Sequence, residues 1–529
     1  MRAAAGPAVD AGGGSAAGTP SEGPAADWDA AVAAGVGGDV GARRALSDVI
    51  DDLGLGLCQA RVVFFAGFIY VLAGVNLFFI TTFSVPIAVE LGLVPCQKAA
   101  LGSAAFAGMF VGNIACLKND SVGRRRPLLL SMLGVLLFAG ASSVVHNFWS
   151  LLALWILMGA SLGLGVPTYN ALCMETTPSD WRYHANAVSM TLFSVATVWG
   201  ASISYVFASD AVSSRQHWAT IVQCSSVLNS LFVVLAVVPG FVESPTFLMR
   251  QRRLAEAREQ LEAMRLQNGR PDVSLNFSVD GSRPRAPNVL DSFATVFSRA
   301  YRPVTLVLGF TTCLLNFISY GQYYALPQVL GSVDLGVSPS QSMLVSTLSD
   351  TAGYGLGCVL APRMGRKMLA LTYLVGTGVS MAVFVCGLEV LLLTAAAQGA
   401  ADGPPRQRTA LALVELGFNS GRLFISVGWS FAYTYVGEAF PTRARAGGSG
   451  VCIACGRIGS FSAPWVFEAL LARTGTGLWY FVAAGVFCVV NAVLVQLVLP
   501  ETKGVRIDDE ADEDASTASL LSEDGSEQS

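Results

Sequence analysis

Twelve apolar stretches of roughly twenty residues each fill the sequence between residues 62 and 499. About twenty apolar residues in a helix are what the hydrocarbon core of a bilayer requires. Charged residues make up only 13% of the 529 residues, against about 25% in soluble chains, so they are too few to coat domains of this size. We therefore predict an all-α membrane protein with twelve transmembrane helices. The predicted spans are 62–84, 99–117, 128–147, 149–173, 186–208, 219–240, 304–326, 342–361, 368–394, 411–437, 446–470 and 477–499.

A polar segment, 241–303, separates the first six spans from the last six. Within it, residues 253–267 alternate in the manner of a surface helix. The first 46 residues are rich in Ala, Gly and Pro and have few large apolar side chains, which is typical of a disordered tail. The predicted organisation is a cytoplasmic tail (1–46), an N-terminal six-helix bundle (47–240), a cytoplasmic central loop (241–303), a C-terminal six-helix bundle (304–500) and an acidic disordered tail (501–529).

The distribution of Lys and Arg predicts the orientation, because basic loops stay on the cytoplasmic side. Loops on the side of the central segment hold 20 basic residues, and the opposite loops hold five. We therefore expect both termini in the cytoplasm.

Three motifs recur at the same place in each half. The sequence E-x-x-P-x-x-x-R follows the fourth span, from Glu175 to Arg182, and the tenth span, from Glu438 to Arg445. A second pair follows spans two and eight: Asp120, Gly123, Arg124 and Arg125 correspond to Pro362, Gly365, Arg366 and Lys367. A third follows spans six and twelve, at Val242-Glu243-Ser244-Pro245 and Pro500-Glu501-Thr502-Lys503. Because six is an even number, the two halves share one orientation and form parallel repeats.

These motifs resemble those of the major facilitator superfamily. The run from Asp120 to Arg125 is similar to that superfamily's signature between helices two and three, with Cys116 where a glycine is usual. The resemblance implies that charged pairs of these motifs hold the cytoplasmic side closed in the outward-open state; the alternative is that the arginines only set topology. The candidate gating residues are Asp120, Gly123, Arg124, Arg125, Glu175, Arg182, Glu243, Gly365, Arg366, Lys367, Glu438 and Arg445.

Further segments resemble one part of the superfamily, the synaptic-vesicle-2-related and organic ion transporters. They are the amphipathic lead-in from Ser47 to Gln59, the element VESPTFL at 242–248, and the stretch from Gly421 to Ser460. Sugar porters share the VESP and PETKG elements and are the alternative. Their glutamine-rich seventh helix is represented here only by Gln322.

Six ionisable residues lie within the predicted spans, all in the second half: Asp350, Glu389, Glu415, Arg422, Arg457 and Glu468. An ionisable residue at membrane depth is a functional candidate by default. At 1.5 Å per residue, Asp350, Arg422 and Arg457 fall near the bilayer midplane, whereas the three glutamates fall near the outer surface.

Two arginines against one aspartate predict an anionic substrate, because a guanidinium suits carboxylate and phosphate groups. The resemblance implies the same, since organic anion carriers usually have Arg where Arg457 stands and organic cation carriers have Asp. The alternative is that Asp350 pairs with one arginine only to offset its burial. The candidate substrate-binding residues are Arg457, Arg422, Asp350, Tyr320, Gln322, Tyr323, Asn316 and Asn76; the polar ones are equally suited to joining helices.

The first span has no acidic residue, although relatives in this group have one there. Asp350 is then the one deep candidate for carrying a proton, so we favour facilitated diffusion or anion exchange over proton symport.

We predict a secondary transporter that moves a small organic anion by alternating access, in the plasma membrane or a vesicle membrane. The alternatives are a sugar-porter-like facilitator and a carrier-like receptor that binds without transporting. A net charge of −4 argues against nucleic-acid binding. The sequence has three histidines and no metal-ligand spacing or nucleophile–base set, so we expect no enzyme activity and no cofactor. The expected partners are the small-molecule substrate and the bilayer, and we expect a monomer.

Overall fold

A computed structural model describes residues 45–116, 122–207, 218–228, 230–231, 243–275, 277, 289–331, 339–396, 404–440 and 445–502. The regular elements within these ranges are helices. In the first half they are α2 (Leu46–Leu53), α3 (Leu57–Arg61), η1 (Val62–Ala66), α4 (Gly67–Glu90), α5 (Pro95–Cys116), α7 (Arg125–Ser142), α8 (Phe148–Thr176), η2 (Ser179–Trp181), α9 (Arg182–Phe207) and η3 (Gln223–Val227). After them come α12 (Pro245–Arg250), α13 (Leu254–Gln267), α14 (Val289–Val296), α15 (Arg302–Gly331), α16 (Pro339–Leu360), α17 (Arg366–Ala396), α18 (Pro404–Glu438), α19 (Arg445–Thr474) and α20 (Leu478–Val498).

Eleven of the twelve predicted spans coincide with long helices in the described part of the chain. Ten of these helices are long and apolar enough to cross a membrane. The eleventh, α16, has 22 residues but is more polar, with serines, threonines and Asp350 along its length. The predicted span 219–240 lies partly outside the described residues, and its described part contains η3.

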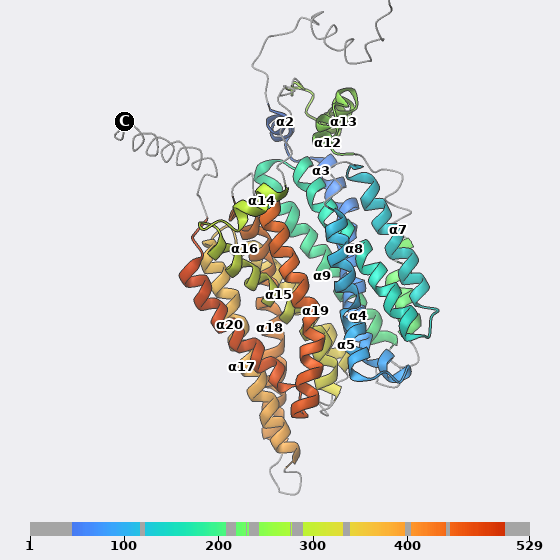
Figure 1. Ribbon diagram of the computed structural model, residues 1–529, viewed down its shortest axis with the longest axis vertical. Helices are drawn as coiled ribbons and strands as arrows, with labels where there is room; N and C mark the ends of the chain where they lie inside the picture. The colour runs from blue at the N-terminus through green and yellow to red at the C-terminus, as the bar shows by residue number, and fades with distance from the viewer. Residues whose placement is uncertain are drawn as a thin grey trace, which may run out of the picture.

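The helices form two groups that repeat the same contacts (Figure 1). In the first half α4 packs against α9, α5 against α8, and α7 against α8. In the second half the corresponding helices pack alike: α15 against α19, α16 against α18, and α17 against α18. This agreement confirms the prediction of two parallel repeats.

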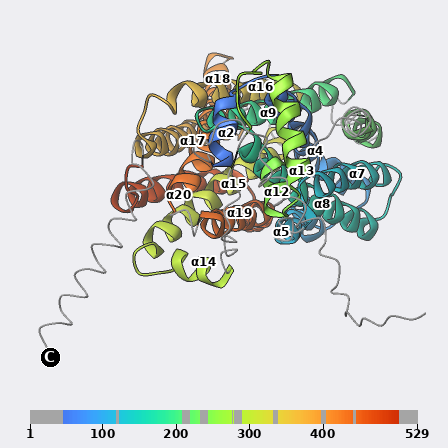
Figure 2. The same ribbon diagram turned by 90° about the horizontal axis from the view of Figure 1, so that it is seen from above.

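The two bundles meet along three helix pairs, seen from above in Figure 2. These pairs are α5 with α19, α9 with α16, and α4 with α15. Counted as spans along the chain, the pairs join span two to span eleven, span five to span eight, and span one to span seven. Spans one, two and five therefore face their counterparts across the middle of the molecule.

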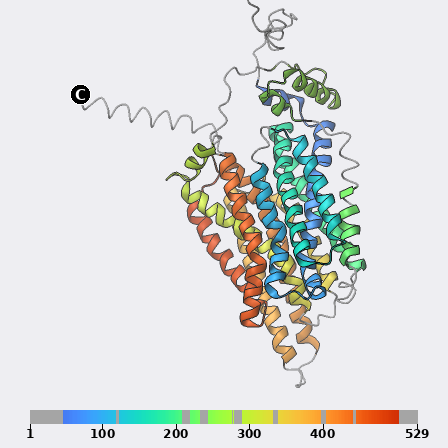
Figure 3. The same cartoon turned by 45° about the vertical axis from the view of Figure 1, so that its right-hand side comes forward.

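A small helical layer lies at one end of the first bundle (Figure 3). The predicted surface helix is confirmed as α13, whose buried residues Leu261 and Met264 pack with Val49 and Ile50 of α2. The buried residues of α2 are Leu46, Val49, Ile50 and Leu53, and their spacing of three and four residues puts the apolar side chains on one face of that helix. Leu261 and Met264, three residues apart, likewise share a face of α13. The amphipathic segment before the first span thus folds onto the central segment.

Candidate functional site

A cavity lies between the two bundles, at the level of the middle of the long helices. Its volume is about 30 Å³, room for about one or two water molecules. Aromatic side chains form much of its wall. Among the lining residues, Arg457 is the one that carries a charge at neutral pH. The lining residues are Tyr70, Ala73 and Leu77 of α4, Met109 of α5, Val166 of α8, Met190 and Phe193 of α9, Tyr320 of α15, Tyr354 of α16, Trp429 of α18 and Arg457 of α19.

Arg457 is buried at this cavity without a partner among the described residues. The residue is 8% exposed, and its Nε atom is shielded from solvent and makes no hydrogen bond. Neither a hydrogen bond nor an ion pair to another described residue satisfies the guanidinium. A buried cation in this condition is unfavourable unless a ligand or water completes it.

Arg422 and Asp350 form a separate cluster inside the second bundle. Arg422 Nη2 forms an ion pair with Asp350 Oδ2, and Tyr323 donates a hydrogen bond to the same oxygen. Ser426 Oγ donates to the other carboxylate oxygen at 3.0 Å. Arg422 Nη1 also donates to the carbonyl oxygen of Ser319 at 2.8 Å. The charges of Asp350 and Arg422 therefore satisfy each other, unlike that of Arg457.

The remaining predicted substrate-binding residues divide between the cavity and the helix contacts. Tyr320 lines the cavity. Gln322 is fully buried, accepts a hydrogen bond from Arg422 at 3.4 Å and lies 3.6 Å from the sulfur of Met381. Asn316 accepts from Ser460 of α19 at 3.0 Å. Asn76 donates to the Leu72 carbonyl of its own helix.

Several cavity residues were not among those predicted from the sequence: Tyr70, Phe193, Tyr354 and Trp429. Helical spacing carries a signal for two of them. Tyr354 follows Asp350 by four residues and Trp429 follows Arg422 by seven, so each shares a helix face with a predicted polar residue. Tyr70 and Phe193 lie in apolar runs without such a marker.

The motif residues of the first half meet at the N-terminal end of α7. Arg124 Nη2 lies 2.8 Å from Glu175 Oε1, and the Arg124 side chain is 5% exposed. Glu243 accepts hydrogen bonds from the backbone N–H groups of Arg124 at 2.8 Å and Arg125 at 3.1 Å. A carboxylate at this position stabilises the N-terminus of a helix. Arg182 donates instead to the Thr177 carbonyl.

The second half repeats this arrangement at the N-terminus of α17. Arg366 Nη2 lies 2.9 Å from Glu438 Oε1. Glu501 accepts from the backbone N–H groups of Arg366 at 2.6 Å and Lys367 at 3.2 Å. The two ion pairs, Arg124–Glu175 and Arg366–Glu438, each connect segments of a single bundle, and none of these contacts joins one bundle to the other. Asp120 lies outside the described residues, and so does the side chain of Arg445.

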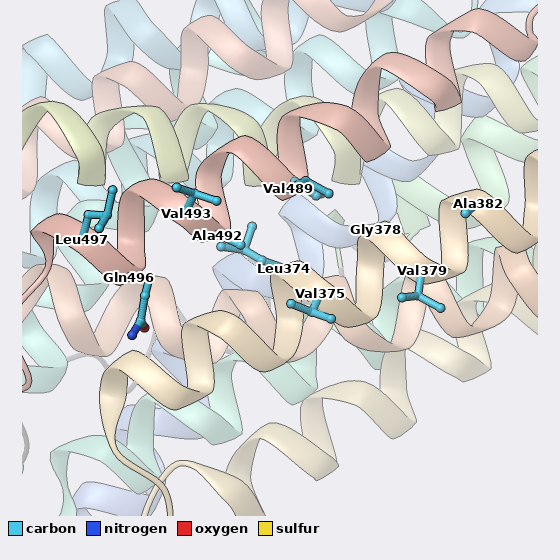
Figure 4. A pocket seen from close by; sticks show the side chains of 11 residues that line it. Leu374, Val375, Gly378, Val379, Ala382, Val489, Ala492, Val493, Gln496 and Leu497 are labelled. Atoms are coloured by element: carbon cyan, nitrogen blue, oxygen red, sulfur yellow. The ribbon is translucent and has the colours of Figure 1, made fainter.

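A larger hollow on the outside of the second bundle has a different character (Figure 4). Its volume is about 550 Å³, and it lies between α17 and α20. Its lining is apolar except for Gln496, and Val375, Val379 and Val493 beside it are exposed on the outer surface. These features are typical of a surface that faces lipid.

In the described part of the chain, two parallel helix bundles, charged motifs at one end and a central cavity are typical of a secondary transporter of the major facilitator superfamily. The sequence from residue 62 to 513 matches the sugar (and other) transporter family, and the chain belongs to that family. This assignment confirms the resemblance drawn from the motifs.

Proteins similar to this chain are named for several different roles. The chain is 26% identical over 427 residues to the putative niacin/nicotinamide transporter NiaP of Bacillus subtilis, covering 79% of this chain and 90% of the relative. It is 25% identical over 488 residues to the synaptic vesicle 2-related protein of Pongo abelii, covering 87% and 81%. Among solved structures, the inward open xylose transporter XylE from E. coli superposes with a TM-score of 0.67 at 15% identity, covering 85% of this chain and 98% of XylE, which supports the fold.

Proposed function

We propose that this transporter moves a small organic anion by alternating access, with Arg457 binding the anionic group. The observation that carries the proposal is the unpaired guanidinium at the cavity between the bundles. The other deep arginine, Arg422, has its countercharge in Asp350 and lies outside the cavity lining. An arginine left without a protein partner at a ligand cavity favours a carboxylate or phosphate as the missing partner.

The cavity walls narrow the class of anion. Trp429, Tyr320 and Tyr354 surround the space beside Arg457, and aromatic rings stack well on planar ligands. The cavity of about 30 Å³ is too small for such a ligand in this state, so binding requires the two bundles to part around it. In the widened cavity a small planar carboxylate would place its ring among these side chains and its carboxylate at the guanidinium. Nicotinate is the natural first test compound, because the relative NiaP is named for niacin and nicotinamide. Nicotinamide is its neutral counterpart.

A sugar is the second candidate, since the family is named for sugars and XylE is a xylose transporter. A sugar site needs many hydrogen-bonding groups. Gln322, the residue most suggestive of a sugar site, is engaged by Arg422 and Met381 and does not line the cavity. This arrangement favours the anion.

The proposal includes the orientation and the moving parts. Residues 47–240 and 304–500 would rock as two bodies around the cavity, with both termini and the central segment in the cytoplasm of a plasma-membrane or vesicle protein. Epitope tags at each terminus should react with antibody only after the cell membrane is permeabilised. Staining of intact cells would contradict this topology.

The direct test is uptake by purified protein in liposomes. The unaltered protein should take up labelled nicotinate, nicotinamide should inhibit weakly, and xylose should have no effect. Arg457→Gln should reduce nicotinate uptake at least about tenfold, the size of one charge-assisted contact, while Arg457→Lys retains part of it. Xylose uptake that survives Arg457→Gln would favour the sugar. Thermal stabilisation by nicotinate without uptake would favour a receptor.

A further inference from the structure

An ion pair joins the two bundles at their outer ends. Lys98 Nζ, near the start of α5, lies 2.8 Å from Glu468 Oε1, near the end of α19. The two side chains are 15% and 8% exposed, so the pair is largely removed from water. Since α5 and α19 belong to different bundles, alternating access requires this pair to separate.

Further polar contacts hold each member of the pair. Tyr324 donates a hydrogen bond to the same Glu468 oxygen at 2.8 Å, and Lys98 donates to Gln328 Oε1 at 2.8 Å. Both of these partners lie on α15. They offset part of the desolvation of the two charges and fix where the carboxylate sits.

The line of contact between α5 and α19 below the ion pair, which we call the outer seam, is also closed. Ser103 of α5 donates to the carbonyl oxygen of Phe461 on α19 at 2.7 Å. A Cβ atom added at Gly102 would lie 2.7 Å from the ring of Tyr324, so the helices leave no room for a side chain there. The outer end of the path to the cavity is therefore closed in this structure, and Lys98 is bound by a carboxylate of the protein itself.

We propose that Lys98 is a second anion-binding group on the transport path, and that Glu468 occupies it as a tethered carboxylate while the outer seam is shut. This inference rests on the proposed function, because the ligand of Lys98 is the same organic carboxylate. When α5 and α19 part, the ammonium is left at the outer mouth, where an incoming anion takes the place of Glu468. The anion thereby stabilises the open seam, and its departure lets Glu468 return.

The position of Lys98 relative to Arg457 supports this order of binding. Glu468 follows Arg457 by 11 residues on α19, about 16 Å along the helix axis. The Lys98 ammonium thus lies about three turns outside the guanidinium. Two cations in succession along one path attract an anion inward.

The test compares variants that both break the ion pair but have opposite effects on anion capture. Lys98→Gln removes the cation, so the KM for external nicotinate should rise about three- to fivefold. Glu468→Gln removes the competing carboxylate and keeps the cation, so the KM should fall by a similar factor. Glu389→Gln, an exposed acid on α17, is the matched control and should leave the KM unchanged. If the pair is only a structural lock, both variants shift the KM in the same direction, which overturns the inference.

A second measurement checks the seam and the folding of the variants without relying on transport. A cysteine replacing Ser103, in a chain whose exposed Cys96 is changed to Ser, reports opening through its reaction with a membrane-impermeant maleimide from outside. Both Lys98→Gln and Glu468→Gln should speed this reaction, and unchanged rates in both would overturn the inference. One combination of results refutes only the role of Lys98: Arg457→Gln abolishes nicotinate uptake, but Lys98→Gln and Glu468→Gln change the KM for nicotinate in the same direction. The absence of nicotinate binding by the unaltered protein refutes the proposed function and this inference together.

Discussion

The Arg422 guanidinium lies over the ring of Tyr323, with its Cζ atom 3.7 Å from the ring centroid, and both side chains hydrogen-bond one oxygen of Asp350. Three helices of the second bundle, α15, α16 and α18, contribute one residue each. The cation–π contact and the ion pair stabilise the guanidinium in the same buried place. The cluster thus joins the helices of one bundle and leaves Arg457 as the free cation of the described cavity.

Asp350→Asn should destabilise the protein strongly, because it leaves the Arg422 charge buried without its countercharge. A loss of about 3–5 kcal/mol is typical when one member of a buried pair is removed. The double variant Asp350→Asn/Arg422→Met should regain much of this loss, since no charge then remains buried. Thermal unfolding in detergent measures both. A double variant less stable than Asp350→Asn would contradict the account.

Gly123→Ala should weaken the N-terminal end of α7 for two reasons. Gly123 has φ = 99°, and a Cβ atom there would lie 2.5 Å from Glu243 Oε2. The substitution therefore strains the backbone and displaces the carboxylate that caps α7, with an expected loss of about 2–4 kcal/mol. Gly475→Ala is the control, because Gly475 has φ = 72° with open space around it. Equal losses of thermal stability in the two variants would show that the Glu243 contact contributes nothing.

Local sequence patterns predict the helices and the repeat but not which distant residues meet. The motif pairs could be found because each half carries the same spacing at the same place. The capping role of Glu243 could not be found from the sequence, because Glu243 lies 119 residues from Arg124 in the chain. Likewise, the sequence placed Asp350, Arg422 and Arg457 at one depth without saying which arginine pairs with Asp350. That choice depends on helix rotation, and a shift of one residue turns a side chain by about 100°.

Asn268→Ala should release α2 from the central segment. The Asn268 amide donates to the carbonyl oxygens of Leu53 and Gly54 and to Gln59 Oε1, and its oxygen accepts from the Cys58 N–H group. One side chain thus bonds to groups on both sides of the turn between α2 and α3. We expect limited proteolysis to cut within residues 45–57 at least about tenfold faster, as local opening becomes easier.

The neighbouring variant Gln267→Ala is the control for this release. Gln267 contacts Arg61 at 3.4 Å at an exposed position, and its loss should leave the cleavage rate unchanged. Equal rates in both variants would mean that the apolar contacts between α2 and α13 hold the segment without Asn268.

Trp429→Ala should weaken binding because it removes the contact with the ring of the ligand. Arg457→Gln should weaken binding because it removes the contact with the negative charge of the ligand. Trp429 lines the cavity with its ring centroid 6.2 Å from that of Tyr320, and its Nε1 donates to Ser319 Oγ at 3.2 Å. Losing a stacking surface of this kind corresponds to about 0.5–1.5 kcal/mol, or about two- to twelvefold in affinity. Because nicotinate and nicotinamide share a ring, Trp429→Ala should weaken the thermal stabilisation by both, whereas Arg457→Gln should weaken that by nicotinate alone. Trp429→Phe keeps a ring and should lie between the unaltered protein and Trp429→Ala. If Arg457→Gln impairs both compounds equally, the guanidinium stabilises the cavity wall and does not bind the carboxylate.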